Sequence, residues 1–291
     1  MPHLHHGASG LLGSAFVAVM FIFTALVYLR GWVSLRSNSL DCIAASRACS
    51  FLVGLFLIWV AIASPLSELD HELLTIHMLK HLLLMTVAPP LILLGEPVRC
   101  VARAFLPATW RTRMSALHRI GKILVRPEVC WLAAAAALVG WHIPGVFTLA
   151  MHSGPWHFVE QSSFLVTGLL FWWPVVRPWP SVIRQDLSMI LYLFFATLPC
   201  DILSGFLVFC DRVVYSDYLS SSHLFGLTAL GDQQCAAALM WTCVTLVYLI
   251  AGAILAVRLL SMQNSRNHVF AQRDLHGKAV PRSAPQTLEA F

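Results

Sequence analysis

Histidines at helical spacing are the residues of this sequence best suited to chemistry. His77 and His81 are four residues apart, and Met78 follows the first of them. On an α-helix this spacing puts both imidazoles on one face, where their nitrogens can bind one metal ion or one porphyrin iron. A helix that opens near Leu73 would carry His77 roughly 6 Å and His81 roughly 12 Å from that end, at about 1.5 Å per residue.

Other ionisable residues are expected at the depth of His81. Counting from the ends of their own apolar segments places His142 and Asp201 about 13 Å inside. Charged groups within hydrocarbon cost several kcal/mol unless they are paired. Lys80 and Asp201 are therefore predicted to form an intramembrane charge pair, either at a functional site or as a structural ion pair between two helices. Pro144, two residues after His142, predicts a kink of the kind that opens a cavity in a helix bundle.

A second tier of polar and thioether residues lies near the same ends of these segments. A single histidine there would more often be a hydrogen-bonded residue of the membrane interface than a metal ligand. Here, however, several histidines gather at one end of the chain's apolar segments. We therefore expect a secondary site or an access path that includes His71, His152, His157, Glu160, Asp232, Gln233 and Met240.

The donor types narrow the ligand. Imidazole with thioether favours copper, and Cu(I) in particular, whereas Mg²⁺ and Ca²⁺ prefer oxygen cages. Zinc would accept the histidines but has less use for Met78 or Met240. The candidate copper ligands are His77, Met78, His81 and His142. Haem is the alternative, held by His77 or His81 together with His142, and a protein that binds no ligand and acts only as a chaperone is a third hypothesis.

The elements that must position these residues are transmembrane helices. The chain has 291 residues, of which 58% are hydrophobic and 11% charged, and its mean hydropathy is +0.74, whereas soluble domains average about 25% charged residues. A membrane-spanning helix needs about 20 apolar residues. Seven segments qualify, which predicts an all-α polytopic membrane protein with a bundle of seven transmembrane helices: 10–30, 43–63, 73–94, 129–151, 158–176, 187–210 and 235–260.

Charge in the connecting loops predicts the orientation. Arginine and lysine concentrate after the first, third and fifth segments and in the C-terminal tail, while the other loops are acidic or uncharged. By the positive-inside rule the N-terminus lies outside and the C-terminus is cytoplasmic. We expect one transmembrane domain over residues 1–262, a disordered cytoplasmic tail over 263–291, and either a surface helix or a basic loop over 96–126. The histidine-rich end then faces outward.

Several short motifs resemble the multi-spanning CtaG-type cytochrome c oxidase assembly factors. The most specific is the histidine helix with its proline-proline exit, in which His77-Met78 and His81 precede Ala88-Pro89-Pro90-Leu91. The others are Ser64-Pro65-Leu66, Trp141-His142-Ile143-Pro144, Trp156-His157 with Glu160, and Asp232-Gln233-Gln234 leading to Met240-Trp241. The family's motif histidines fall on His77, His81, His142 and His157, and its acidic-amide pair on Asp232 and Gln233. Asp201 has no match in the pattern.

This resemblance implies a non-enzymatic accessory protein of the bacterial inner membrane that helps to build a haem-copper terminal oxidase and assists copper delivery to its catalytic subunit. The partners implied are an oxidase subunit, periplasmic copper chaperones and membrane lipid, and no nucleic acid. The sequence contains no nucleophile elbow, P-loop or dinucleotide fingerprint that would indicate ordinary enzyme chemistry.

Overall fold

The computed structural model describes residues 5–36, 44–64, 69–105, 126–176, 187–219 and 226–278, with side chains except at 5–14, 103–105 and 262–278. Within these ranges the secondary structure is helical and contains no strand, which confirms the all-α prediction. The α-helices are α1 (His5–Arg36), α2 (Ala45–Ala63), α3 (Leu74–Leu82), α4 (Ala88–Leu94), α5 (Pro97–Phe105), α8 (Pro127–Trp141), α9 (Pro144–His152), α10 (Gly154–Val176), α11 (Ser188–Phe209) and α12 (Ala229–Lys278). The shorter elements are η2 (Leu69–His71), the π-helical η3 (Leu83–Val87) and η4 (Ser216–Tyr218).

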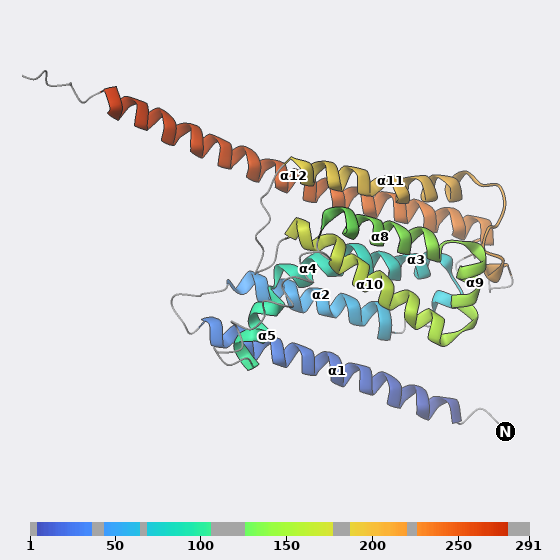
Figure 1. Ribbon diagram of the computed structural model, residues 1–291. Coiled ribbons are helices and arrows are strands. Elements are labelled where there is room, and N and C mark those ends of the chain that lie inside the picture. The colour runs from blue at the N-terminus through green and yellow to red at the C-terminus, as the bar shows by residue number, and fades with distance from the viewer. Residues whose placement is uncertain are drawn as a thin grey trace, which may run out of the picture.

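Five stretches of helix are long and apolar enough to cross a membrane: Ala15–Arg36, Ala45–Ala63, Leu74–Leu94, Ser188–Phe209 and Ala229–Ser261. The bent pair α8 and α9 makes a sixth if it is counted as one span. The remaining predicted span, 158–176, corresponds to α10, which runs along the bundle beside α8 (Figure 1) but is less apolar because it carries Glu160 and Gln161. The chain is thus a helical membrane protein, and the count of seven spans remains a prediction.

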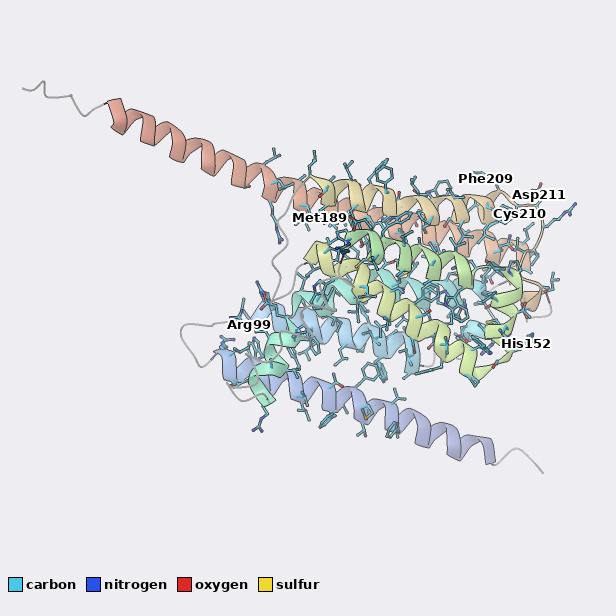
Figure 2. All side chains as sticks on the ribbon, viewed as in Figure 1. Arg99, His152, Met189, Phe209, Cys210 and Asp211 are labelled. Atoms are coloured by element: carbon cyan, nitrogen blue, oxygen red, sulfur yellow. The ribbon has the colours of Figure 1, made fainter. Side chains whose placement is uncertain are left out.

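The two ends of the bundle differ in the charges they carry. Arg99 lies at one end, whereas His152 and Asp211 lie at the other (Figure 2). This separation agrees with the charge pattern from which the orientation is predicted. The orientation itself, with the N-terminus outside, stays a prediction.

The histidine-bearing helix continues through two prolines by way of a π-helical turn. Proline lacks an N–H donor and its ring conflicts with the carbonyl four residues earlier, so Pro89 and Pro90 disturb a regular α-helix. Here η3 widens the turn directly before α4, and the helix then continues to Leu94. A π-helical turn inside an α-helix often marks a functional position. Gly168 of α10 packs on this turn so closely that a Cβ there would lie 2.7 Å from the Met85 carbonyl oxygen.

The predicted kink near Pro144 is a sharp bend. α8 ends at Trp141, α9 begins at Pro144, and their axes differ by 77°. Figure 1 shows α9 turning across the end of the bundle instead of continuing along it. The predicted depth of about 13 Å for His142 assumed a straight helix, so it overestimates the distance of this residue from the end of the bundle. The bend places His142 at the end of α8, facing the interior.

Two predicted cytoplasmic segments are only partly described. α12 continues without a break to Lys278, so residues 263–278 are helical where a disordered tail is predicted. This stretch contains no proline, and its first glycine is Gly277, so nothing in it interrupts the preceding helix. Residues 279–291 lie outside the described part of the chain. In the segment 96–126, α5 forms a helix, whereas 106–125 lies outside the described residues.

Candidate metal centre

The start of the histidine-bearing helix is held in place by α12. The Asp232 carboxylate accepts hydrogen bonds from the backbone N–H of Leu74 (2.6 Å) and of Thr75 (3.1 Å), and from the Thr75 hydroxyl (2.6 Å). The first N–H groups of a helix have no partner within it, so a buried carboxylate here acts as a cap supplied by another helix. Asp232, predicted at a secondary site or access path, thus serves to position α3.

Gln233 fixes the segment that follows α11. Its side-chain oxygen accepts a hydrogen bond from the backbone N–H of Val214 (2.7 Å), and its amide nitrogen donates to the carbonyls of Arg212 (3.1 Å) and Leu207 (3.3 Å). The side chain is almost fully buried. The acidic-amide pair therefore organises the end of the bundle around the histidines.

Two imidazoles and a carboxylate meet just inside this end. The Nε2 atom of His77 lies 3.6 Å from Glu160 Oε1, and the Nε2 atom of His81 lies 3.5 Å from the same oxygen. One nitrogen or oxygen atom from each of the three residues lies within 4.8 Å of the others. The spacing of four residues places both histidines on one face of α3 as predicted, and Glu160 comes to the centre of the group instead of its rim.

These three side chains contain polar atoms without hydrogen-bond partners. Among the described residues, nothing hydrogen-bonds to either nitrogen of His77, to Nδ1 of His81 or to either carboxylate oxygen of Glu160. All three side chains are buried, with Glu160 at 0% exposure. Leaving such groups buried without a partner costs several kcal/mol. A bound cation would satisfy the converging lone pairs, so the residues present fit a metal ion.

A buried ion pair borders this group and corrects one prediction. The Lys80 ammonium pairs with Asp70 in η2, and not with Asp201 as predicted. Asp70 has 0% of its surface exposed and Lys80 3%. The short helix η2 brings Asp70 back over the start of α3, an arrangement that sequence spacing alone does not reveal. Asp201, on α11, keeps one buried carboxylate oxygen without a hydrogen-bond partner among the described residues.

His157 links the ion pair to the group formed by His77, His81 and Glu160. Its Nε2 lies 3.4 Å from Asp70 Oδ2 and 4.0 Å from Glu160 Oε2. Asp70, His77 and His157 also bring their ligand atoms within 4.8 Å of one another. We call the six residues that are connected in this way the polar cluster: Asp70, His77, Lys80, His81, His157 and Glu160. Sequence reasoning missed Asp70, which it treated only as an acidic loop residue.

Tyrosines from the segment after α11 close the polar cluster from the end of the bundle. The Tyr218 hydroxyl donates a hydrogen bond to the Asp70 carbonyl (2.6 Å), and the Tyr215 hydroxyl donates to the His142 carbonyl (3.2 Å). Burial raises the pKa of both phenols, and for Tyr218 the nearby Asp70 carboxylate raises the pKa further. Both hydroxyls therefore stay protonated as donors and hold η2 and the bend between α8 and α9 in place.

His142 presents one nitrogen to a thioether. Its Nδ1 lies 2.7 Å from the Leu138 carbonyl oxygen, which can only accept, so Nδ1 carries the proton. The Nε2 lone pair then faces the Met78 sulfur at 3.3 Å. The His142 and His81 rings lie 6.1 Å apart, centroid to centroid. The structure thus brings together all four predicted copper ligands, with Met78 and His142 forming a pair beside the imidazoles of α3.

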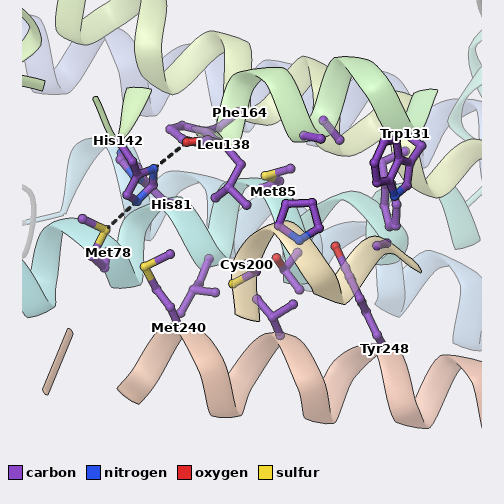
Figure 3. A pocket seen from close by; sticks show the side chains of 18 residues that line it. Met78, His81, Met85, Trp131, Leu138, His142, Phe164, Cys200, Met240 and Tyr248 are labelled. Carbon is purple, nitrogen blue, oxygen red and sulfur yellow. Dashed lines mark hydrogen bonds between the residues drawn. The ribbon is translucent and has the colours of Figure 1, made fainter. Parts of the chain in front are cut away.

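Sulfur-containing side chains line a cavity directly behind this pair (Figure 3). The cavity has a volume of about 40 Å³, and α3, α8, α10, α11 and α12 contribute to its wall. Its sulfur and imidazole side chains are Met78, Met85, Met240, Cys200, His81 and His142, and the other lining residues are aliphatic or aromatic except Thr86. We call it the sulfur cavity. Met85 and Cys200 carried no role in the sequence prediction, although Met85 lies four residues after His81 and so on the same helical face.

The remaining predicted residues lie at the rim. His71 has 53% of its side chain exposed and lies 3.6 Å from Asp70, with its ring 5.8 Å from that of His157. His152 has 72% of its side chain exposed and pairs with Asp217 at 2.9 Å. His71 therefore adjoins the polar cluster, whereas His152 belongs to a separate surface pair.

The chain is a helical membrane protein that buries imidazoles, carboxylates and thioethers together at one end of its bundle. Residues 26–261 match Caa3_CtaG, the cytochrome c oxidase caa3 assembly factor family. The chain belongs to this family, which confirms the resemblance found in the sequence.

Curated relatives extend beyond this chain. Uncharacterized protein Mb0105 of Mycobacterium bovis and uncharacterized protein MT0111 of Mycobacterium tuberculosis are each 24% identical to it over 294 residues, covering 97% of this chain. The match covers 42% of each relative, so the chain spans about two-fifths of their length. No solved structure matches the chain.

Proposed function

We propose that this protein assists the assembly of a cytochrome c oxidase in the bacterial inner membrane by delivering copper to its catalytic subunit, acting without catalysis of its own. The observation that carries the proposal is the convergence of His77, His81 and Glu160, which have five buried nitrogen and oxygen atoms without a hydrogen-bond partner among the described residues. An assembly factor that delivers copper needs to bind the ion and release it. Buried polar atoms without hydrogen-bond partners are suited to binding it, because leaving them without a partner costs free energy.

The donor set supports copper as the cargo. Imidazole nitrogens suit copper and zinc alike, but the thioether of Met78, 3.3 Å from the His142 Nε2, adds a soft donor that favours Cu(I). The Lys80 ammonium balances the charge of the Asp70 carboxylate. Glu160 is then the carboxylate of the polar cluster whose negative charge Lys80 does not balance. A cation that enters the polar cluster would therefore meet two imidazoles and one carboxylate.

The haem alternative gains no support. Sites for ligands of drug or cofactor size have volumes of about 300–1,000 Å³, whereas the cavity beside His81 and His142 has about 40 Å³. A porphyrin between these rings would require α3 and α8 to separate. An absorption spectrum of the purified protein without a Soret band is the expected result.

The predicted orientation places the histidines where copper could be transferred to the oxidase. With the histidine-rich end on the periplasmic side, His77 lies about 5 Å and His81 about 10 Å below the start of α3, at about 1.5 Å per residue. The copper of an oxidase catalytic subunit lies buried in the membrane, so a donor that holds its ion below the surface is suited to transfer. An oxidase subunit and a periplasmic copper chaperone are the partners we propose.

The decisive test removes the histidines. Cells that carry a His77→Ala/His81→Ala double variant should assemble oxidase with a reduced copper content, measured by elemental analysis of the purified oxidase, and with correspondingly reduced activity. His152→Ala is the matched control because its side chain is exposed and paired elsewhere. A normally copper-loaded oxidase in the double variant, with the protein at wild-type level in the membrane, would refute the proposal.

A binding measurement separates delivery from a purely structural role. The purified wild-type protein should bind Cu(I) more tightly than the double variant, as measured by competition with a colorimetric chelator. Equally weak binding by both proteins would favour a chaperone that contacts the oxidase and holds no ion.

A further inference from the structure

We infer that the sulfur cavity is a second metal site, separate from the polar cluster and selective for Cu(I) over divalent ions. The inference adds a second binding site to the proposed function. It rests on the proposed function only because it takes copper as the ion that is delivered. It is supported by the donors that line the cavity, by the uncharged character of the wall, and by the position of the cavity relative to His81.

The donors come from three different helices and meet at one void. Met78 and Met85 belong to the continuous helix formed by α3 and η3, Cys200 to α11 and Met240 to α12. Figure 3 shows the labelled side chains of Met78, Met85, Cys200 and Met240 among those that line the cavity. Thioethers and thiols are soft ligands that select Cu(I). Four sulfur side chains around one cavity are a donor set suited to this ion.

An imidazole completes this donor set. The Nε2 of His142 has its lone pair directed at Met78, because Nδ1 donates to the Leu138 carbonyl. Cu(I) lying near Met78 would therefore meet a nitrogen donor already oriented by the backbone. Outer hydrogen bonds of this kind fix ligand orientation and raise metal affinity.

The wall of the cavity disfavours a divalent ion. Among the described residues, the side chains that line it include histidine but no aspartate, glutamate, lysine or arginine. The cost of moving an ion into a medium of low dielectric constant rises with the square of its charge, so a monovalent ion incurs about a quarter of the penalty of a divalent one. The polar cluster, with Asp70 and Glu160, has the opposite character. The cavity is therefore more selective for a monovalent ion than the polar cluster is.

His81 connects the two sites. Its Nε2 lies 3.5 Å from Glu160 in the polar cluster, and its ring also lines the sulfur cavity. Met85 lies one turn further along the same helix, and Met240 lies about 16 Å from the start of α12 at about 1.5 Å per residue. The cavity therefore extends deeper into the bundle than the polar cluster does. An ion captured by the polar cluster would pass His81 to reach it.

The cavity is large enough for this role. A cavity of about 10–15 Å³ is enough to hold one water molecule. This cavity has a volume of about 40 Å³. The cavity therefore has room for a single metal ion beside the sulfur side chains that line it.

The test is selenium X-ray absorption on the full-length protein, purified in detergent with selenomethionine in place of methionine. The probes are Ag(I), which mimics Cu(I) but is not oxidised to a divalent ion in air, and Cu(I) itself under anaerobic conditions. We expect a selenium-metal contact in the wild type. We also expect a Met85→Leu/Met240→Leu variant to lose most of this signal and to bind Ag(I) about tenfold or more weakly.

Two further variants make the result specific. Met189→Leu is the matched control, because Met189 is buried in α11 but does not line the cavity, and it should retain the contact and the affinity. Leucine conserves the volume of methionine, so both leucine variants should fold, as checked by size-exclusion chromatography. A variant of the polar cluster that leaves the cavity wall unchanged, His77→Ala/Glu160→Gln, should keep the selenium-metal contact.

Each outcome has one meaning. Absence of a selenium-metal contact in the wild type overturns the inference, yet copper bound through nitrogen and oxygen would leave the proposed function intact. Loss of the contact in His77→Ala/Glu160→Gln would show that the cavity is not a separate site. Retention of the contact in that variant together with a copper-deficient oxidase would support both proposals.

Discussion

Breaking the buried ion pair between Lys80 and Asp70 is the sharpest test of the arrangement seen here. Both side chains are almost completely buried, at 3% and 0% exposure. Replacing Lys80 by Met keeps a long apolar side chain but leaves the Asp70 carboxylate without its ammonium partner. Removing one partner of a buried pair typically costs about 3–5 kcal/mol. His157, 3.4 Å from the same carboxylate oxygen, offers partial compensation, so we expect about 3 kcal/mol, toward the lower end of that range.

The assay is thermal unfolding of the purified protein in detergent, followed by loss of the monodisperse peak in size-exclusion chromatography. A destabilisation of this size corresponds to a fall in Tm of roughly 6–12 °C. The double variant Lys80→Met/Asp70→Asn removes both charges and should recover most of the loss, because a neutral pair of similar volume carries no uncompensated charge. Lys80→Met/Asp201→Asn should show no such recovery.

Recovery with Asp201→Asn but not with Asp70→Asn would refute the pairing observed in the structure. It would restore the pairing that the sequence alone suggests. Wild-type stability of the single Lys80→Met variant would instead show that the pair contributes nothing, which its burial argues against.

Three further predictions follow from single contacts. Asp232→Ala should destabilise the protein by about 2–4 kcal/mol in the same thermal assay, because it leaves the buried N–H of Leu74 unsatisfied, and Asp232→Asn, which retains one acceptor oxygen, should cost less. Gly168→Ala should lower stability by about 1–3 kcal/mol, since its methyl group would meet the backbone of Met85, and the loss should be accompanied by weaker Ag(I) binding. His152→Ala should change stability by less than about 1 kcal/mol, because exposed ion pairs contribute little, and a larger fall in Tm would contradict its assignment to a surface pair.

Much of the architecture could be predicted because membrane helices are specified locally. A run of apolar residues long enough to span the bilayer has few alternatives to a helix, since every backbone polar group must be satisfied within the segment. The same reasoning predicted that His77 and His81 share a face, and that the chain bends at Pro144. Local patterning did not reveal that the bend reaches 77°, because that angle depends on what α9 packs against.

The partners of the buried charges could not be predicted in the same way. Depth counted along a helix placed Lys80 and Asp201 at similar levels, but depth does not specify the rotation of a helix about its axis. Asp70 reaches Lys80 because η2 folds back over the start of α3, where the Tyr218 hydroxyl holds its backbone carbonyl. The acidic loop residue that sequence analysis assigned no role thus becomes a buried counterion.

The sequence by itself determined that this chain is an all-helical membrane protein, that it carries histidines and methionines suited to copper, and which end of the bundle holds them. Only the tertiary structure decided that Glu160 completes the imidazole pair, that Asp232 and Gln233 position the site, and that Met85 and Cys200 face the same cavity. The reason is physical. Composition and periodicity act within one segment, whereas a site formed by several helices depends on how their side chains pack against one another, and this packing sets the rotation of each helix.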